Sequence, residues 1–275
     1  MGNDLSSNSA SRGTLYWRRP VIAWALYDWG NSAFATSVMV GFFPIFFNTT
    51  WSDSANGAET TARVMTVNGL ASLTLALAAP LLGATADRGG WRKPFLTTFA
   101  VAGAMATASL YLVPAGDWLT AVTVFGIASV GFAGANVFYD AMLVDVADES
   151  QFDRISAFGY ALGYIGGGLL LAIHLAMIVA PEWFRLADAK HAVRMVFLSV
   201  APWGLIFTLP LLFFVKEQKP GQRRKFAAAF NQGLGQLRAT FRRIRELRPV
   251  VLFLIAYWLY IDGVNTVMKV AIDFG

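Results

Sequence analysis

The sequence of 275 residues contains no cysteine and only two histidines. Without cysteine there can be no disulfide bond, thiolate metal site, iron–sulfur cluster or cysteine nucleophile, and two histidines alone are too few for most zinc sites. The residue patterns of ATP-binding loops, zinc proteases and serine hydrolases are also absent. We therefore expect no metal, no cofactor and no enzymatic activity.

Charge is also scarce. Charged residues make up 14% of the chain and hydrophobic residues 56%, with a mean hydropathy of +0.51, whereas soluble domains carry roughly 25% charge. Five uncharged windows are at least 21 residues long: 64–86, 95–116, 118–139, 155–181 and 195–215. Because about 20 apolar residues in a helix cross a bilayer, this composition excludes a cytosolic enzyme, a secreted disulfide-rich protein and a disordered chain.

Two further segments bring the predicted membrane spans to seven. Residues 21–47 are apolar except for Asp28, and residues 249–275 are apolar up to Asp262. Backbone groups in lipid must be hydrogen-bonded within the chain, so all seven are predicted to be helices. The sequence thus predicts an all-α integral membrane protein.

Lysine and arginine concentrate on one predicted side of the membrane. The amino-terminal tail (1–20) and the second, fourth and sixth connecting segments carry seventeen of them, against four in the other connecting segments. Cytoplasmic loops carry this excess, so we expect a cytoplasmic amino terminus. The net charge of +5 is then a sign of topology, and we expect no nucleic-acid partner.

The sixth connecting segment, residues 216–248, has its own periodicity. Apolar residues recur every three or four positions from Phe226 to Leu247, with arginines between them. This pattern predicts an amphipathic helix on the anionic cytoplasmic leaflet. A helix that binds a calmodulin-like partner is the alternative.

Polar residues recur at matching positions in the first and seventh spans. Each has Leu-Tyr shortly before an aspartate, then an asparagine three residues later: Asp28 and Asn31, and Asp262 and Asn265. Residues at this spacing share a helix face, and a carboxylate in the bilayer costs at least ~2.5–3.5 kcal/mol. We predict a polar cavity that binds solute or relays a proton; interhelical hydrogen bonding is the alternative.

The fourth span ends in a second polar group. Tyr139 and Asp140 share a face with Asn136, which predicts either part of the same cavity or a solvated helix end. The acidic residues that follow, Asp145 and its neighbours, are interpreted as solvated loop charges.

The fifth span contains Gly159, Gly163 and Gly167 at intervals of four. Small residues at this spacing favour close helix packing; bending during gating is the alternative. His174 shares the glycine face and is interpreted as a hydrogen-bonded packing residue, with proton transfer as the alternative.

Residues 83–93 read GATADRGGWRK, which resembles the loop signature of the major facilitator superfamily, G-x-x-x-D-[RK]-x-G-[RK]-[RK]. Trp91 replaces the first residue of the final basic pair. The resemblance implies that a gating loop formed by Gly83, Asp87, Arg88, Gly90 and Arg92 controls the conformational change and does not bind solute.

Three other segments narrow the resemblance: ALYDWGNSAF (25–34), VFYDA (137–141) and SAFGYALGYIGGG (156–168). They look like the vacuolar effluxer branch, which includes the fungal autophagy-related permease and bacterial relatives. Asp140 stands where bacterial relatives are expected to have asparagine. The resemblance implies secondary transport, with amino acids as the favoured solute, in a bacterial inner membrane or a fungal vacuolar membrane.

The expected organisation has four parts. Residues 1–20 form a cytoplasmic tail, 21–215 a major-facilitator-type six-helix bundle, 216–248 a basic cytoplasmic linker helix, and 249–275 the first helix of a second half. Such transporters consist of two six-helix halves that bind solute between them. The expected partners are the lipid bilayer, a small polar solute, a coupling proton, and a second half or a self-association partner.

Two other functions are compatible with this sequence. The chain could be a half-transporter or regulatory membrane protein that needs a partner and carries no flux. It could also be a seven-helix receptor, which the predicted cytoplasmic amino terminus and the internal repeat oppose.

Overall fold

The computed structural model describes residues 15–53, 56–217, 226–242 and 248–273. In the last two helices it leaves out several side chains, so those of Asp262 and Asn265 lie outside the described part. Within the described ranges the chain is helical and contains no β-strand. The expectation of an all-α fold is confirmed.

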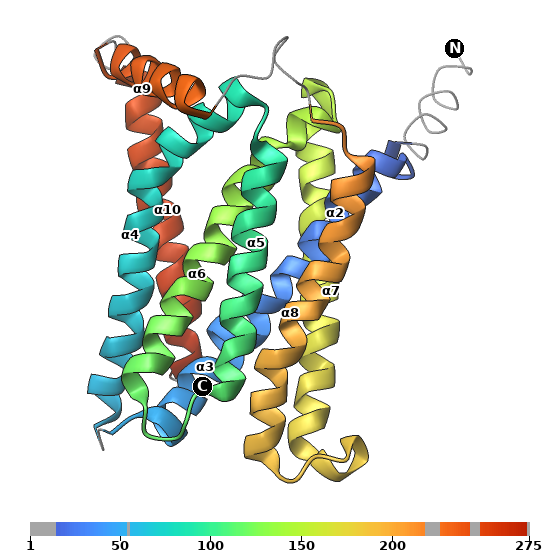
Figure 1. The fold of residues 1–275 in the computed structure, drawn as a ribbon, viewed down its shortest axis with the longest axis vertical. Coiled ribbons are helices and arrows are strands. Elements are labelled where there is room, and N and C mark those ends of the chain that lie inside the picture. The colour runs from blue at the N-terminus through green and yellow to red at the C-terminus, as the bar shows by residue number, and fades with distance from the viewer. Residues whose placement is uncertain (1–14, 54–55, 218–225, 243–247, 274–275) are drawn as a thin grey trace, which may run out of the picture.

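The helices follow one another in chain order, and most of them run along the length of the bundle (Figure 1). Their bounds are α2 Arg19–Ala33, α3 Phe43–Phe46, α4 Gly57–Gly89, α5 Arg92–Ser109, α6 Trp118–Ala141, α7 Phe152–Val179, α8 Ala189–Phe214, α9 Phe226–Arg242 and α10 Arg248–Asp273. The short helical turns are η1 Phe34–Phe42, η2 Phe47–Trp51, η3 Leu110–Leu112, η4 Leu143–Asp145, η5 Glu149–Gln151 and η6 Pro181–Phe184.

Six helical segments of the described chain are long and apolar enough to cross a membrane. They are Arg19–Trp51, Gly57–Gly89, Arg92–Leu112, Trp118–Asp145, Glu149–Val179 and Ala189–Phe214. The seventh predicted span is also helical, as α10, and its described apolar part is Arg248–Ile261. The bundle is that of a multi-pass membrane protein.

Polar caps fix where three of these spans begin. Asn56 accepts a hydrogen bond from the Ala58 amide before α4, Asp117 accepts one from Thr120 before α6, and Asp188 accepts one from His191 before α8. Each cap satisfies an amide that the first turn of a helix leaves unpaired. All three lie at the end of the bundle opposite Arg19.

The first span widens into π-helix after α2. The Phe43 amide donates to Val38 and the Ser52 amide donates to Phe47, each five residues back. Pro44 has no amide to donate and its ring excludes the carbonyl four residues earlier, which favours the wider turn. The sequence predicted a continuous span here but not this change of geometry, which rotates the residues after it around the helix axis.

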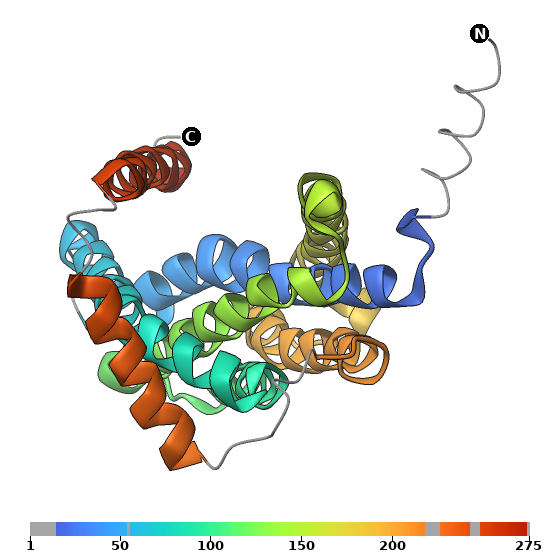
Figure 2. The same ribbon diagram turned by 90° about the horizontal axis from the view of Figure 1, so that it is seen from above.

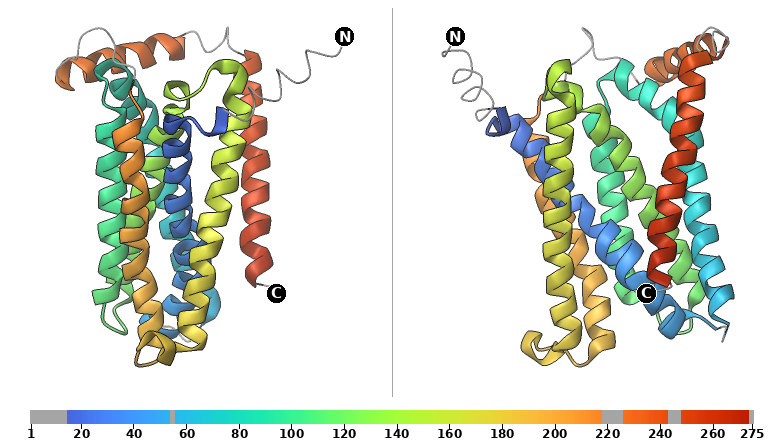
Figure 3. Two further views of the ribbon diagram at one scale, coloured as in Figure 1. Left: turned by 90° about the vertical axis from the view of Figure 1, so that its right-hand side faces the viewer. Right: turned by 180° about the vertical axis from the view of Figure 1, so that it is seen from behind.

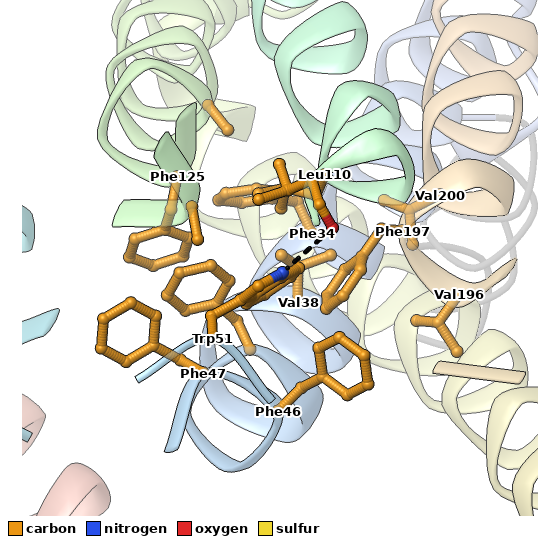
Figure 4. Close-up of a cluster of buried hydrophobic side chains, with 14 of the residues drawn as sticks. Phe34, Val38, Phe46, Phe47, Trp51, Leu110, Phe125, Val196, Phe197 and Val200 are labelled. Carbon is orange, nitrogen blue, oxygen red and sulfur yellow. Dashed lines mark hydrogen bonds between the residues drawn. The ribbon is translucent and has the colours of Figure 1, made fainter. Parts of the chain in front are cut away.

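A cluster of aromatic side chains fills the end of the bundle opposite Arg19 (Figure 4). This aromatic cluster comprises Phe34, Phe43, Phe46, Phe47, Trp51, Phe125 and Phe197, all buried. The rings of Phe43 and Phe125 stack with centroids 3.9 Å apart, and the Trp51 indole N–H donates to Val113 O at 3.3 Å. The π-helical part of the first span is therefore held by rings from α6 and α8.

The six spans form a packed bundle, and α10 stands beside it. α2 packs against α7 and α8, α5 against α6 and α8, and α4 against α6 and α9. Figure 2 shows α7 and α10 on one side of α2, with α5 and α8 on the other side. The described side chains from Leu252 to Tyr260 are all exposed, so this helix buries little of its surface in the bundle.

The linker helix α9 lies across the end of α4, as Figure 3 shows from two sides. A Cβ atom placed on Gly233 would lie 3.2 Å from the Cβ of Ala84, so the two helices approach closely there. Arg238 and Arg242 are exposed. The sequence predicted that this helix lies on the membrane surface. It did not predict that the helix also contacts α4, as it does at Gly233.

Candidate functional site

A row of glycines on α7 faces α2. A Cβ atom on Gly163 would lie 2.6 Å from Asp28 Oδ2 and 2.7 Å from Ser32 Oγ, and one on Gly159 would lie 2.6 Å from the Trp24 ring. Gly167 would meet Thr36 Oγ1 at 3.1 Å. No side chain larger than hydrogen fits at the closest of these contacts, so the glycines determine how near α2 lies to α7.

Asp28 lies half-buried at the centre of this contact. Ser32, one helical turn later, donates a hydrogen bond from Oγ to Asp28 Oδ1 at 3.4 Å. The carboxylate therefore sits between its own helix and the glycine face of α7. No cation pairs with it among the described residues, so its charge is available to a bound group.

Three aromatic rings adjoin the carboxylate. Tyr139 of α6 stacks on Trp24 at 4.4 Å and on Tyr27 at 4.6 Å between ring centroids, and the Trp24 indole N–H donates to Tyr139 O at 3.1 Å. The hydroxyls of Tyr27 and Tyr139 are buried and have no hydrogen-bond partner among the described residues. Buried hydroxyls without a partner are uncommon in folded proteins, and these two lie in the core next to the contact between α2 and α7.

Asn31 points to different neighbours from Asp28. Its Nδ2 donates to Asn136 Oδ1 of α6 at 2.7 Å. It also lines a cavity of about 40 Å³ among α2, α5, α6 and α8, whose wall is mostly apolar apart from Asn31, Thr107 and Thr208. The structure therefore brings Asp28 to α7 and Asn31 to α6, although their spacing predicted a common face.

Asp140 ends the polar face of α6. Its side chain is exposed, and its carboxylate is near enough to repel that of Asp28. We call Asp28, Asn31, Ser32, Tyr27, Tyr139, Asn136 and Asp140 the polar cluster. Of these, Asn136 was noted in the sequence only as a neighbour on a face, and Tyr27 and Ser32 only as parts of a motif.

The predicted gating loop is mostly helix. Gly83, Asp87 and Arg88 belong to α4, which continues to Gly89. Only Gly90, with φ 64° and ψ 48°, and Trp91 separate α4 from α5. The amides of Gly90 and Trp91 both donate to Ala86 O, so a glycine in the left-handed region ends the helix and brings α4 and α5 into a tight turn.

Charged side chains join this turn to the ends of α6 and α8. Arg92 Nε lies 2.8 Å from Asp87 Oδ1, and its Nη1 lies 3.4 Å from Asp145 Oδ2. Glu217 accepts hydrogen bonds from the amides of Arg92 at 2.8 Å and Lys93 at 3.4 Å. We call Asp87, Arg92, Asp145 and Glu217 the charge network.

Two members of the charge network were not predicted. Asp145 was interpreted as a solvated loop charge, and this is wrong, because η4 turns its side chain beneath Arg92 and leaves none of it exposed. Glu217 was not singled out. The available signal was an acidic residue directly after an apolar span, since the free amides at a helix amino terminus attract a carboxylate.

His174 joins three segments in the core. Its Nδ1 lies 2.9 Å from Ser37 Oγ of η1, and its Nε2 lies 2.9 Å from Ser199 Oγ of α8. Ser199 donates its own proton to Val196 O at 3.0 Å, so it can only accept from the histidine. Nε2 therefore carries hydrogen and Nδ1 accepts from Ser37, an arrangement that supports packing and leaves both ring nitrogens occupied.

Among the described residues, no group of three His, Asp or Glu side chains is placed to hold a metal ion.

Comparison with known families gives one match. The sequence model of the family described as "Vacuole effluxer Atg22 like" matches residues 55–152 and 144–275. No solved structure matches the chain.

Individual relatives agree with the family match. An uncharacterized MFS-type transporter, YxiO of Bacillus subtilis, is 35% identical over 92% of this chain and 59% of its own length. Autophagy-related protein 22-1 of Emericella nidulans is 31% identical over 44% of this chain and 21% of its own, and autophagy-related protein 22 of Yarrowia lipolytica is 28% identical over 44% and 23%. The chain thus spans less than two thirds of each of these relatives.

Proposed function

Because the chain belongs to the family of vacuole effluxer Atg22-like proteins, we propose that it is the amino-terminal part of a secondary transporter. It moves a small polar solute across a membrane by alternating access, either down the solute's gradient or coupled to an ion gradient. Relatives described as transporters support this function over an enzymatic one.

The observation that carries the proposal is the environment of Asp28. A carboxylate within an apolar span is costly, and here it faces glycines of α7 with a single serine as hydrogen-bond partner. The two buried hydroxyls near it, on Tyr27 and Tyr139, have no hydrogen-bond partner in the described part of the chain. These groups suit a cation such as an ammonium or a proton, which favours solutes with an amino group and is compatible with amino acids.

The helix α10 supports a two-half arrangement. Its described side chains are almost all exposed along an apolar stretch, so most of its surface is available to pack against further helices. We assign α10 to a second half that would cover the side of α2 bearing α7 (Figure 2). Asp262 and Asn265, whose side chains lie outside the description, would then belong to the opposite wall of the cavity.

The charge network is the proposed gate. It connects α4, α5 and the ends of α6 and α8 through Arg92 and Glu217, and such ion pairs can break and re-form when helices slide. The basic residues at this end support a cytoplasmic location. We propose that the protein resides in the inner membrane if the host is bacterial, or in the vacuolar membrane if the host is fungal.

The test is solute flux into liposomes by the protein isolated from its native membrane, with its intact mass compared with the 29.9 kDa of this chain. We expect wild-type protein to take up a labelled amino acid, and Asp28→Asn to lose most of the flux and its pH dependence. The matched control is Asp148→Asn, an exposed aspartate after η4, which should retain both.

Two outcomes would contradict the proposal in different ways. Unchanged flux and pH dependence in Asp28→Asn would remove Asp28 from the solute and proton site. No flux in the intact protein, across amino acids and other small polar solutes, would instead favour a non-transporting membrane protein that acts with a partner.

A further inference from the structure

A cavity separates the π-helical part of the first span from α4, at the end of the bundle opposite Arg19. Its volume is about 250 Å³, close to the lower end of the range of about 300–1,000 Å³ for small-molecule sites. Its described lining comes from residues between Met39 and Asn48 of the first span, from residues between Thr60 and Asn68 of α4, and from Phe125 of α6. We call it the π-helix cavity. It shares no residue with the polar cluster or the charge network.

The wide turns of the first span form one wall of this cavity. Met39 and Val40 belong to η1, Pro44 and Ile45 to α3, and Asn48 to η2. The widening around Pro44 thus places side chains from three consecutive helical segments on one cavity. π-Helical turns are rare in proteins and are frequent at functional sites, which is the first indication that the π-helix cavity binds a ligand.

Three polar side chains of the lining have free hydrogen-bonding groups. Asn48, Thr61 and Asn68 line the cavity and make no side-chain hydrogen bond within the described part of the chain, whereas the Thr60 hydroxyl donates to Asn56 O at 3.2 Å. Asn68 is half-buried and lies inside the span Gly57–Gly89. A side-chain amide offers two donors and an acceptor, and polar groups within a span are costly unless they are paired. The amide of Asn68 is therefore available to a ligand.

The described lining carries no charged side chain. Arg63 belongs to the same stretch of α4, but its guanidinium is held by Asp53 and Glu59 and lies over the Trp118 ring. A charged ligand would lose its hydration in the cavity without gaining a counter-charge. The ligand is therefore uncharged, in contrast to the cation that suits Asp28.

Apolar side chains determine the shape of the ligand. Phe125 is buried and stacks on Phe43 with centroids 3.9 Å apart, so its ring is fixed by the aromatic cluster. Met39 and Met65 line the cavity from its two walls. Methionine side chains adapt to a neighbouring surface and make favourable contacts with aromatic rings. This lining suits a compact, flat apolar body.

The cavity opens toward α10. Phe125 of α6 closes it on one side, and Figure 2 shows α6 and α10 on opposite sides of the first span. The side chains of Val40, Ile45 and Met65 are exposed and surround the opening. The proposed second half lies on the same side as α10, so a ligand in the cavity would be covered by protein and not by lipid.

We propose that the π-helix cavity binds an uncharged small molecule with a flat apolar body and an amide or hydroxyl group. The apolar body lies against Phe125 between Met39 and Met65, and the polar group exchanges hydrogen bonds with Asn68. This site is separate from Asp28 and differs from it in charge, so the first span carries two sites of different chemistry.

The test is isothermal titration calorimetry of the intact protein in detergent at pH 7, with the heat from empty micelles subtracted. The probes are phenylacetamide, phenylacetate and 2-phenylethylammonium, which have nearly the same shape and differ in charge. We expect saturable binding of phenylacetamide and about tenfold weaker binding of both ions, because their charge stays unpaired. Asn68→Leu should weaken phenylacetamide binding about fivefold through the lost hydrogen bonds, and Met65→Trp, which fills the opening, should abolish it.

Each variant has a matched control. Asn231→Leu replaces an exposed asparagine of α9, and Met105→Trp replaces a methionine of α5 that is 67% exposed; both should bind phenylacetamide as wild type does. Equal binding of the three probes, or wild-type binding by both Asn68→Leu and Met65→Trp, would overturn the proposal. Absence of saturable phenylacetamide binding would overturn it too, and would mean that the second half fills the cavity. The comparison of probes uses wild-type protein, so it stands even if a variant fails to fold, and no readout depends on flux.

Discussion

The first span contributes to both ends of the bundle. The two ends differ in whether the buried polar atoms of their side chains have hydrogen-bond partners. In the aromatic cluster, stacked rings surround Trp51, whose indole N–H has a backbone acceptor. In the polar cluster, Asp28 is half-buried, and the hydroxyls of Tyr27 and Tyr139 have no hydrogen-bond partner within the residues that the structure describes. One end is closed by packing, while the other retains groups that can bind.

This difference indicates where the molecule is rigid. Aromatic pairs contribute about 0.5–1.5 kcal/mol each beyond the area they bury, and the aromatic cluster contains several. The contact between α2 and α7 sets glycines against Trp24, Asp28 and Ser32, and no cation pairs with that carboxylate among the described residues. We infer that the aromatic cluster anchors the first span at its π-helical end.

Loss of the anchor should have the largest effect. Trp51→Ala removes a fully buried ring and leaves a cavity among Phe43, Phe46 and Phe197, so we expect the free energy of unfolding to fall by about 3–5 kcal/mol. The measurement is denaturant unfolding in detergent micelles. Trp183→Ala, at a tryptophan that is 81% exposed, is the control. Similar losses in the two variants would mean that the aromatic cluster is not an anchor.

The second-largest effect is expected at the contact between Gly163 of α7 and Asp28 of α2. Gly163→Ala adds a methyl group 2.6 Å from Asp28 Oδ2, so the Asp28 and Ser32 side chains must turn aside or α7 and α2 must separate, at a cost of about 1–3 kcal/mol. Gly168→Ala lies five residues along α7, where nothing lies within 4 Å of the added atom. There alanine should be neutral or stabilise the helix by up to ~1 kcal/mol. Unfolding of the two variants, measured side by side, tests the contact; equal stability would contradict it.

The sequence predicts the fold more completely than it predicts which side chains contact one another. Uncharged windows of bilayer length predict the six spans because the bilayer core admits few charges and requires internal hydrogen bonds. Asp28 and the glycine row are both singled out by the sequence, yet their contact is not, because spacing along one helix does not say which other helix lies opposite. For the same reason, the sequence does not predict that Asp28 contacts α7 while Asn31 contacts α6.

The errors concentrate where the chain turns. Asp145 is interpreted as solvated because it follows a span, and only the fold of η4 under Arg92 shows otherwise. Glu217 is 125 residues from the Arg92 amide that it binds. No local sequence pattern can reveal a contact between residues so far apart in the chain. The π-helical turns depend on packing around Pro44 as well as on the proline itself, so apolarity alone predicts an ordinary helix there.

The smallest effect is expected at the rim of the aromatic end. Arg63 contacts Asp53 at 2.6 Å and Glu59 at 2.7 Å, and its guanidinium lies 4.1 Å from the Trp118 ring centroid. The hydrogen bond from Arg63 holds the pKa of Asp53 below its ordinary value. Because the pair is exposed, its contribution to stability is small and screened by salt.

The sign of its pH dependence follows from the direction of that shift. A carboxyl whose pKa is lower in the folded protein stabilises it above the unfolded pKa, ~3.9 for aspartate, and loses this contribution as the pH falls below that value. Asp53→Asn should therefore unfold at a slightly lower temperature than wild type at pH 7, and the gap should close as the pH falls below ~3.9 and through the lower pKa of the folded protein. The control is Asp148→Asn, at an exposed aspartate near the other end of the bundle. A gap that persists or widens in acid would mean that Arg63 does not act on Asp53 through its charge, and that the rim, like the aromatic cluster beneath it, is held by packing alone.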